Sequence, residues 1–265
     1  MDVKSNIPTQ GAQSLRRALA VLRLVSETQE HGMRLVDLVA ATGLNRPTVH
    51  RLLQVLREER VVEQDEETRR YRVGTELALL GMARGNRFPI RGIARPFLNE
   101  VAAKVGDTVF LTIRQGADSI AIDRVTGGYP IQVLATEVGV RRPLGVGVAG
   151  VVMLACMPLD EAIALVSGNA RRLARLGLTV AGLQARVDEA RTFGYAWAPR
   201  GVVPSTSAVS VPVLDERGEA LAAVTVAAMV DRLSDGRLTE VVAALQDAAW
   251  RIARRRKELE ISRTR

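Results

Sequence analysis

The chain has 265 residues, of which 47% are hydrophobic and 25% charged, the composition of an ordinary globular protein of one or two domains. Its 37 basic and 29 acidic residues give a net charge of +8, which permits an anionic partner without identifying one. One cysteine and two histidines exclude an intramolecular disulfide and a zinc site of the usual ligand number, so we expect no metal and a reducing, cytoplasmic location.

The first segment is predicted to be helical. Apolar residues at positions 15, 18, 19, 22 and 25 recur at helical spacing, and Ser14 is a candidate cap for the first turn. A short second helix over residues 35–41 is expected to stop at Gly43. A third helix is expected after Asn45, a candidate N-cap, with Pro47 in its first turn. Its apolar stripe consists of Val49, Leu52, Leu53 and Leu56.

A hairpin and a further helix are predicted next. Residues 61–64 and 70–73 read as two strands joined by a polar turn at 65–69. A helix, a helix-turn-helix and a hairpin in this order predict a winged helix over residues 1–74. Residues 75–84 are predicted to form another helix that residues 85–89 break, so we expect a linker and boundary over 75–89 and a second domain over 90–265.

The second domain mixes strands with helices. Strands are predicted over residues 108–114, 119–125, 131–137, 208–214 and 220–228. Helices are predicted over residues 90–105, 148–157, 159–166, 180–193 and 235–260. Strand pairs separated by helices predict an α+β domain.

The polar face of the third helix is the candidate surface for reading DNA. Arginine can chelate guanine edges, asparagine and glutamine can pair with adenine, and hydroxyls can hold phosphate. The candidates are Asn45, Arg46, Thr48, His50, Arg51 and Gln54 on the helix, and Arg69, Arg70 and Arg72 on the hairpin. Taken singly, each residue is more often simply part of a solvated polar surface. The order of glycine turn, capped helix, apolar stripe and basic hairpin favours double-stranded operator DNA.

Several segments of the chain resemble the isocitrate lyase regulator (IclR) family of bacterial transcription factors. The resemblance rests on residues 13–22, 41–53 and 71–74, and continues through 123–125, 142–144, 193–196 and 211–213, so it covers about residues 13–250. It implies an N-terminal winged helix, a linker helix and a C-terminal GAF-like α/β effector-binding domain. It also implies a homodimer or homotetramer on a palindromic operator.

A glycine-rich run at residues 145–150 has two interpretations. Its GxGxxG spacing is that of a dinucleotide-binding loop, so the alternative function is a nucleotide-binding metabolic enzyme. No acidic residue follows at the distance that such a loop requires, at about residues 165–172. In the resembling family this run starts a helix beside the effector pocket, and Gly145, Val146, Gly147 and Val148 are then candidates for binding a carboxylate. The wider apolar run over residues 143–159 is too short to span a bilayer, so we expect no membrane partner.

The chain departs from the family at the polar groups that are expected to hold the effector. The four corresponding positions are Ala198, Ala208, Thr225 and Ala227, of which only Thr225 is polar. The nearby hydroxyls of residues 205, 206, 207 and 210 could substitute, or they could be ordinary turn chemistry. We therefore expect a small-molecule effector that is an aromatic or otherwise apolar organic acid.

No catalytic residue and no cofactor are expected. Both histidines, His31 and His50, lie in the predicted DNA-binding domain, so no histidine is present in the second domain to activate a nucleophile. Cys156 lies among apolar residues and is predicted to be a buried, inert thiol.

Overall fold

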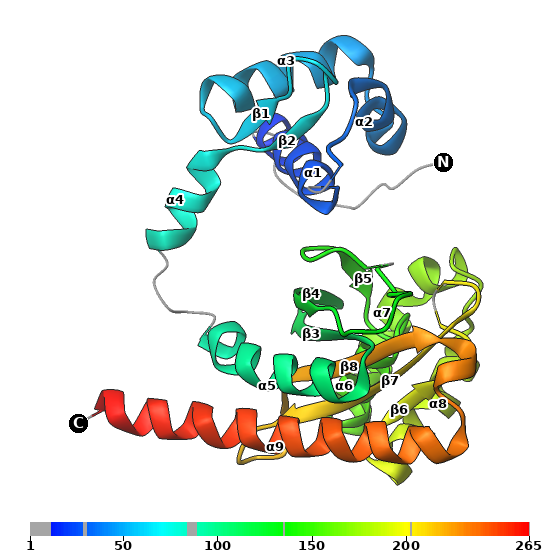
Figure 1. Cartoon of the computed structure of the whole chain (residues 1–265). Coiled ribbons are helices and arrows are strands. Elements are labelled where there is room, and N and C mark those ends of the chain that lie inside the picture. Colours follow the sequence, from blue (N-terminus) through cyan, green and yellow to red (C-terminus); the bar gives the residue numbers. More distant parts are fainter. Residues whose placement is uncertain (1–11, 29–30, 84–88, 135, 202, 265) are drawn as a thin grey trace. The chain divides into compact units, whose positions relative to one another are not determined.

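The computed structural model describes residues 12–28, 31–83, 89–134, 136–201 and 203–264. The chain divides into two compact units, Met1–Arg87 and Phe88–Arg265, and each is described by itself (Figure 1).

The first unit is a winged helix. Its elements are α1 (Gln13–Glu27), α2 (Leu35–Thr42), α3 (Arg46–Glu58), β1 (Val62–Gln64), β2 (Tyr71–Val73) and α4 (Thr75–Ala83). The three first helices and the hairpin share one core, which consists of Val21, Val25, Leu38, Val49, Leu53, Val62 and Tyr71. The antiparallel β1–β2 pair is extended by a bridge between Met33 and Tyr71. The winged helix predicted from the sequence is confirmed.

Local signals set the helix ends around the turn between α2 and α3. Gly43 follows α2 with a φ of +65°, a left-handed conformation that glycine adopts without strain. The Asn45 side chain accepts a hydrogen bond of 2.9 Å from the Thr48 amide and so caps α3 as predicted. The predicted capping role of Ser14 is wrong, because α1 begins one residue earlier, at Gln13, and its N-cap is Ala12.

The second unit is built on a six-stranded antiparallel sheet with the strand order β5-β4-β3-β8-β7-β6. The strands are β3 (Thr108–Gln115), β4 (Asp118–Val125), β5 (Arg141–Pro143), β6 (Ala196–Ala198), β7 (Thr206–Leu214) and β8 (Ala220–Met229). The helices are α5 (Pro89–Val105), α6 (Val148–Ala155), α7 (Leu159–Ala174), α8 (Val180–Phe193) and α9 (Asp235–Thr264), with a single 3-10 turn at Val230–Arg232. This is the predicted α+β class. Of the predicted break over residues 85–89, residues 85–88 lie outside the described residues, and Pro89 begins α5.

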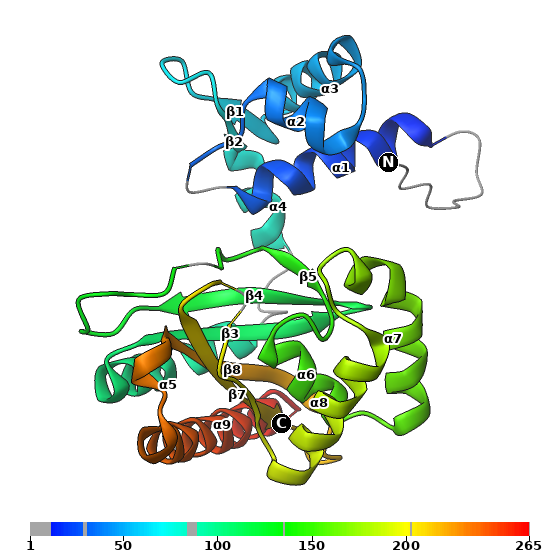
Figure 2. The same ribbon diagram turned by 90° about the vertical axis from the view of Figure 1, so that its right-hand side faces the viewer.

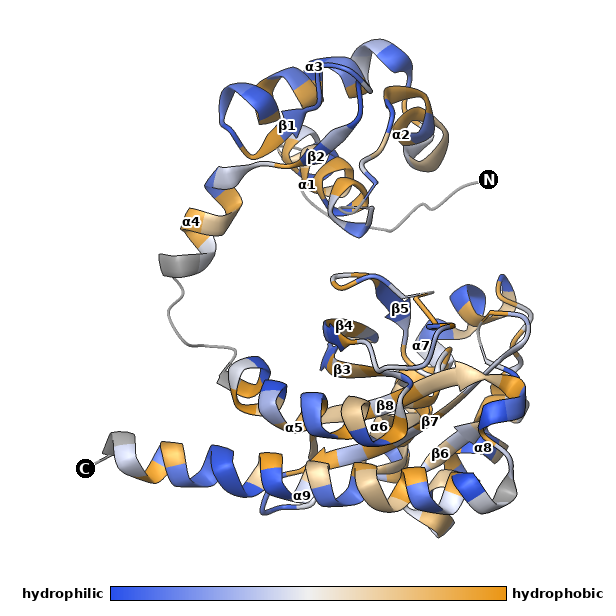
Figure 3. Cartoon of the chain, viewed as in Figure 1, coloured by the Kyte–Doolittle hydropathy of each residue, from blue (hydrophilic) through white to orange (hydrophobic). Residues whose placement is uncertain are grey.

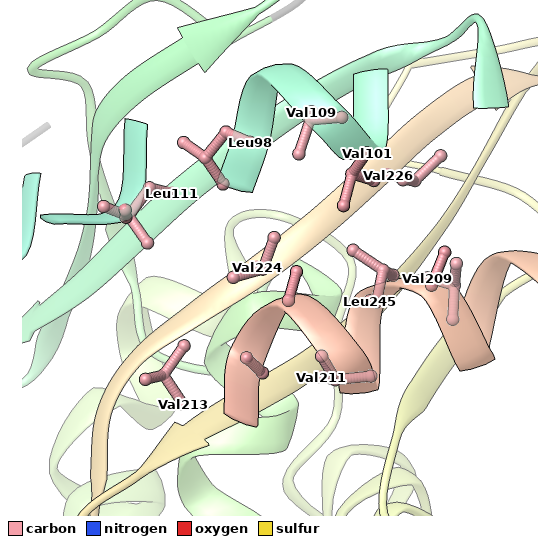
Figure 4. Close-up of a cluster of buried hydrophobic side chains, with 14 of the residues drawn as sticks. Leu98, Val101, Val109, Leu111, Val209, Val211, Val213, Val224, Val226 and Leu245 are labelled. Atoms are coloured by element: carbon pink, nitrogen blue, oxygen red, sulfur yellow. The ribbon is translucent and has the colours of Figure 1, made fainter. Parts of the chain in front are cut away.

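The two faces of the sheet are covered differently. Helices α5 and α9 pack on one face, while α6, with α8 against it, packs on the other (Figures 1 and 2). The α5/α9 face holds the larger core, whose side chains interdigitate between the strands and the two helices (Figure 4). The smaller core around α6 takes Ala196 and Ala223 from the sheet. The part of this second face that α6 leaves uncovered forms a cavity.

One predicted strand is wrong. The described residues of this segment, 131–134 and 136–137, form no strand, and the place beside β4 is taken by the short strand β5. The loop is held instead by the side chain of Gln132. Its amide nitrogen donates to the Gly106 carbonyl at 2.9 Å, and its amide oxygen accepts from the Thr108 hydroxyl at 2.8 Å. These side-chain bonds take the place of the strand ladder that the apolar pattern predicted.

The other differences concern lengths and short elements. Helix α7 continues to Ala174, beyond the predicted end at residue 166, and Asn169 in this extension donates 2.7 Å to the Ala117 carbonyl. The three-residue strands β5 and β6 were not predicted, because a strand of that length has no readable period.

A buried carboxylate joins the start of β3 to the start of α9. Asp107, 1% exposed, accepts hydrogen bonds from Arg232 Nε at 2.7 Å and from Arg237 Nη2 at 2.6 Å. The hydrogen bond that Arg232 donates to Asp107 raises the pKa of the Arg232 guanidinium above its ordinary value. Arg232 also lies over the ring of Tyr129, 3.5 Å from its centroid. The cluster therefore fixes the loop after β4 as well as α9.

We expect Asp107→Asn to lower the free energy of unfolding of this unit by about 3 kcal/mol, because it leaves two partly buried guanidinium groups without their carboxylate. Both tryptophans, Trp197 and Trp250, lie in this unit, so urea unfolding of the whole chain followed by tryptophan fluorescence reports on it alone. Asp231→Asn, an exposed change beside the cluster, is the control and should stay within about 0.5 kcal/mol of wild type. Equal losses in the two variants would contradict this account of Asp107.

Candidate DNA-reading helix and effector cavity

Helix α3 presents its predicted DNA-reading residues on one side. His50, Arg51 and Gln54 are exposed on the side of α3 away from the buried Val49 and Leu53, and Arg46 is exposed in the first turn of the helix. Thr48 is half-buried, and the side-chain oxygen of Asn45 is already occupied by the cap of α3. The exposed side chains start at the amino-terminal turn of α3, where a recognition helix meets base edges.

The three hairpin arginines do not lie alike. Arg70 Nη1 donates 2.8 Å to the Gly32 carbonyl, which ties the hairpin to the segment before α2. Arg72 Nη1 lies 3.9 Å from the Asp65 carboxylate. Arg69 is exposed at the tip of the hairpin and has a φ of +57°. Arg69 is thus the hairpin arginine best placed to reach outward.

The turn of the hairpin is fixed by Asp65. Its carboxylate accepts hydrogen bonds from the Thr68 amide at 2.8 Å and the Thr68 hydroxyl at 2.7 Å. The hydrogen bond from the Thr68 hydroxyl, more than any other contact, lowers the pKa of Asp65 below its ordinary value. The turn that carries Arg69 is therefore a defined structure.

A cavity of about 960 Å³ lies on the α6 side of the sheet in the second unit. The predicted effector residues that line it are Val146, Gly147, Val148, Ala198, Ala208, Thr225 and Ala227. Its floor includes a buried apolar cluster of Phe110, Val133, Ala208 and Ala227. The structure thus brings together residues that are up to 81 positions apart in the sequence, between Val146 and Ala227.

Gly145 is placed differently from the other predicted effector residues. A Cβ on Gly145 would lie 2.5 Å from the Leu183 side chain on α8, and its φ is +99°. A Cβ on Gly150 would lie 2.5 Å from the Gly145 amide nitrogen. Gly145 therefore lets the segment before α6 pack closely against α8, and Gly150 lets α6 pack against that segment, while Gly147, the N-cap of α6, lines the cavity.

Basic side chains that the sequence did not single out also line the cavity. They are Arg142 on β5, Arg186 on α8 and Arg200 after β6, with Glu189 as the acidic residue of the lining. Burial lowers the pKa of both Arg142 and Arg186 below the ordinary arginine value. Arg186 Nη1 lies 3.4 Å from the Gly145 carbonyl, a long contact to a neutral acceptor. A partly desolvated guanidinium beside an apolar floor favours an anionic ligand.

The hydroxyl groups near the predicted effector positions have separate roles. Thr206 lines the cavity and donates 2.7 Å to the Val203 carbonyl. Ser207 donates 3.0 Å to the Ala198 carbonyl, and Ser205 is exposed. Ser210 is fully buried and lies 2.8 Å from the Thr225 hydroxyl.

Cys156 is half-buried, so its predicted full burial is wrong. Burial nevertheless raises the pKa of its thiol to about 11, although the positive charge of Arg191 opposes the shift. The group is therefore a protonated thiol at neutral pH, which is a weak nucleophile.

Within the described ranges, His, Cys, Asp and Glu side chains form no group of three or more that could hold a metal ion. None of the helices in those ranges has the length and apolar character needed to cross a membrane.

Known proteins match both units of the chain. Residues 14–66 match the IclR helix-turn-helix domain, and residues 82–254 match the C-terminal domain of the bacterial transcriptional regulator IclR. The glycerol operon regulatory protein of Streptomyces griseus is 31% identical over 245 residues, which cover 91% of this chain and 95% of that protein.

Solved structures are similar over the same extent. An IclR transcriptional regulator from Alicyclobacillus acidocaldarius has a TM-score of 0.72 and 25% identity, over 91% of this chain and 98% of that one. An IclR homologue from Microbacterium hydrocarbonoxydans, complexed with 4-hydroxybenzoate, shares the fold with a TM-score of 0.70 and 21% identity, over 91% and 98% of the two chains.

These matches decide between the two interpretations of residues 145–150. The family consists of transcriptional regulators, so the alternative of a nucleotide-binding metabolic enzyme is wrong. The run precedes α6 in the domain that carries the cavity. The chain belongs to the IclR family of DNA-binding bacterial transcriptional regulators.

Proposed function

We propose that residues 1–74 read a double-stranded operator through α3 and that residues 90–265 bind a small organic acid with an aromatic or apolar body, with residues 75–89 as the linker. The observation that carries the effector part is the cavity itself, in which the arginines Arg142 and Arg186 border an apolar floor. A carboxylate suits the arginines and the amino end of α6, and an aromatic ring suits the floor. The 4-hydroxybenzoate complex of the Microbacterium homologue supports a ligand of this kind.

For DNA, we propose that Arg46, His50, Arg51 and Gln54 face base edges and that Thr48 and Arg69 contact the phosphate backbone. The exposure of these side chains beside the buried stripe of α3 supports this assignment. Arg70 and Arg72 serve mainly to hold the hairpin, since their guanidinium groups already face the Gly32 carbonyl and Asp65.

We also propose that the chain acts as a homodimer or homotetramer. Helix α4 is apolar after its first turn, and its Leu79 and Leu80 are 58% and 56% exposed (Figure 3). Leu15 and Leu19, two of the apolar residues that recur at helical spacing on α1, are 63% and 40% exposed. Exposed apolar side chains of this kind mark a surface that binds another protein. A second copy is the partner that suits an operator with two half-sites.

Replacing Arg51 by alanine should weaken binding to a selected operator by about 1–3 kcal/mol and binding to a scrambled duplex much less, because it removes a base contact. The operator is obtained by selecting fragments that the protein binds from random DNA, and both affinities are measured at several salt concentrations. Arg57→Ala, on the same helix but hydrogen-bonded to Gln64 at 3.2 Å, is the matched control and should leave the ratio unchanged. An equal loss on both duplexes would remove Arg51 from the base-reading set.

Introducing charge on α4 through Leu79→Glu and Leu80→Glu together should reduce the mass of the assembly by half or more, because glutamate cannot be buried without a partner. Light scattering gives the mass, and circular dichroism checks that the helices remain. Leu159→Glu, which places the same charge on an exposed leucine of α7, is the control. An unchanged mass in the double variant would exclude α4 from the interface.

Removing the charge of Arg186 through Arg186→Gln should weaken the binding of an aromatic carboxylic acid such as 4-hydroxybenzoate by roughly 1.5–3 kcal/mol, because a charge-assisted hydrogen bond is lost. Calorimetry at neutral pH gives the affinity. Arg175→Gln, an exposed change at the end of α7, is the control and should have no effect. If both variants bind like wild type, the acid lies outside the reach of Arg186.

A further inference from the structure

Two buried hydroxyl groups meet at the floor of the cavity. Ser210 on β7 and Thr225 on β8 are directly paired across the two strands, and they are 0% and 7% exposed. Their side-chain oxygens lie 2.8 Å apart. Thr225 also lines the cavity, so the direction of the hydrogen bond in this pair decides whether the floor presents a donor or an acceptor to a ligand.

The direction of the hydrogen bond between them follows from counting protons. A hydroxyl carries one proton and can accept through its lone pairs. Ser210 Oγ lies 3.1 Å from the Val224 carbonyl, which can only accept, so Ser210 donates there. Either hydroxyl could donate across the 2.8 Å contact, and with the Ser210 proton directed to Val224 the donor there is Thr225. The reverse direction would give up the bond to Val224 and form one hydrogen bond fewer within the pair.

The surroundings of Thr225 are apolar. Its cross-strand neighbour on β3 is Phe110, and Ala208 and Ala227 belong to the same part of the floor. With its own proton directed to Ser210, the Thr225 hydroxyl has only lone pairs left to offer a ligand in the cavity that it lines. A ligand carboxylate at this place would be repelled, because it and the Thr225 oxygen are both hydrogen-bond acceptors. A ligand hydroxyl could instead donate a hydrogen bond to Thr225.

We propose that the ligand is a hydroxy acid whose hydroxyl group donates to Thr225 Oγ1, and that Ser210 is the positioning residue that makes Thr225 an acceptor. The proposal rests on the proposed function, in which the same cavity binds an aromatic or apolar acid. It adds the requirement that the ligand carry a hydrogen-bond donor where it meets the floor, in addition to the carboxylate, an acceptor, that the arginines favour.

The test compares three matched sets of probes, the 2-, 3- and 4-substituted hydroxybenzoates, fluorobenzoates and formylbenzoates. Fluorine has nearly the size of a hydroxyl but cannot donate, and a formyl oxygen only accepts. Wild type should bind one hydroxybenzoate about tenfold tighter than the fluorobenzoate with the same substitution, because one buried hydrogen bond is at stake. Calorimetry on the full chain gives the affinities.

Variants separate the two hydroxyl groups. Thr225→Val should abolish the preference for hydroxyl over fluorine. Ser210→Ala releases the Thr225 proton for donation, so it should tighten the binding of the matching formylbenzoate severalfold, an effect that a loss of packing would not produce. Ser207→Ala, on the same strand and bonded only to a main-chain carbonyl, is the control for a buried serine and should not produce this gain.

The outcomes distinguish this inference from the proposed function. If the fluorobenzoates and hydroxybenzoates bind wild type equally, or if formylbenzoates bind wild type better, the direction assigned to the pair is overturned while the acid site stands. If Thr225→Val keeps the hydroxyl preference, Thr225 is not the acceptor. If no acid of the panel binds at 10 mM-scale concentrations, both the acid-binding function and this inference fall.

Discussion

The arrangement of the second unit depends on the alternation of side chains along its strands, because one face of each strand packs in the core and the other faces α6 and the cavity. On β8, Val224 and Val226 enter the core under α5 and α9, while Thr225 and Ala227 face the cavity. A shift of one residue in register would exchange core for cavity. The β-branched residues on the closed face thus hold the register, and the open face is left to carry the ligand site.

The winged helix could be predicted in detail because its signals are local. A glycine in the left-handed region, an N-cap at Asn45 and an apolar stripe each report on a few neighbouring residues. The same is true of the long strands and helices of the second unit. The family resemblance added the candidate effector residues, and most of them line the cavity.

The features that the sequence did not reveal depend on contacts between distant segments. The apolar residues around 131–137 resemble a strand, but Gln132 bonds to Gly106 and Thr108, which lie more than twenty positions away. Arg186 adjoins an ordinary apolar stripe on α8, and only the packing of α8 against α6 makes it line the cavity. Arg70 looks like any other hairpin arginine until its contact with Gly32 is seen. The local sequence pattern around a residue carries no information about partners that are distant in the chain.

The alanines of the cavity have a consequence for the range of ligands. Ala198, Ala208 and Ala227 project little, and the resulting volume lies at the upper end of the roughly 300–1,000 Å³ typical of small-molecule sites. A wide cavity selects only weakly for the shape of a ligand, so selection among ligands depends on the few polar groups of the cavity. Larger apolar residues at these positions are equally compatible with strand pairing, since the ladder uses only the backbone. The breadth of effectors that such a regulator accepts is therefore set by side-chain volume at a few strand positions and can change while the fold is retained.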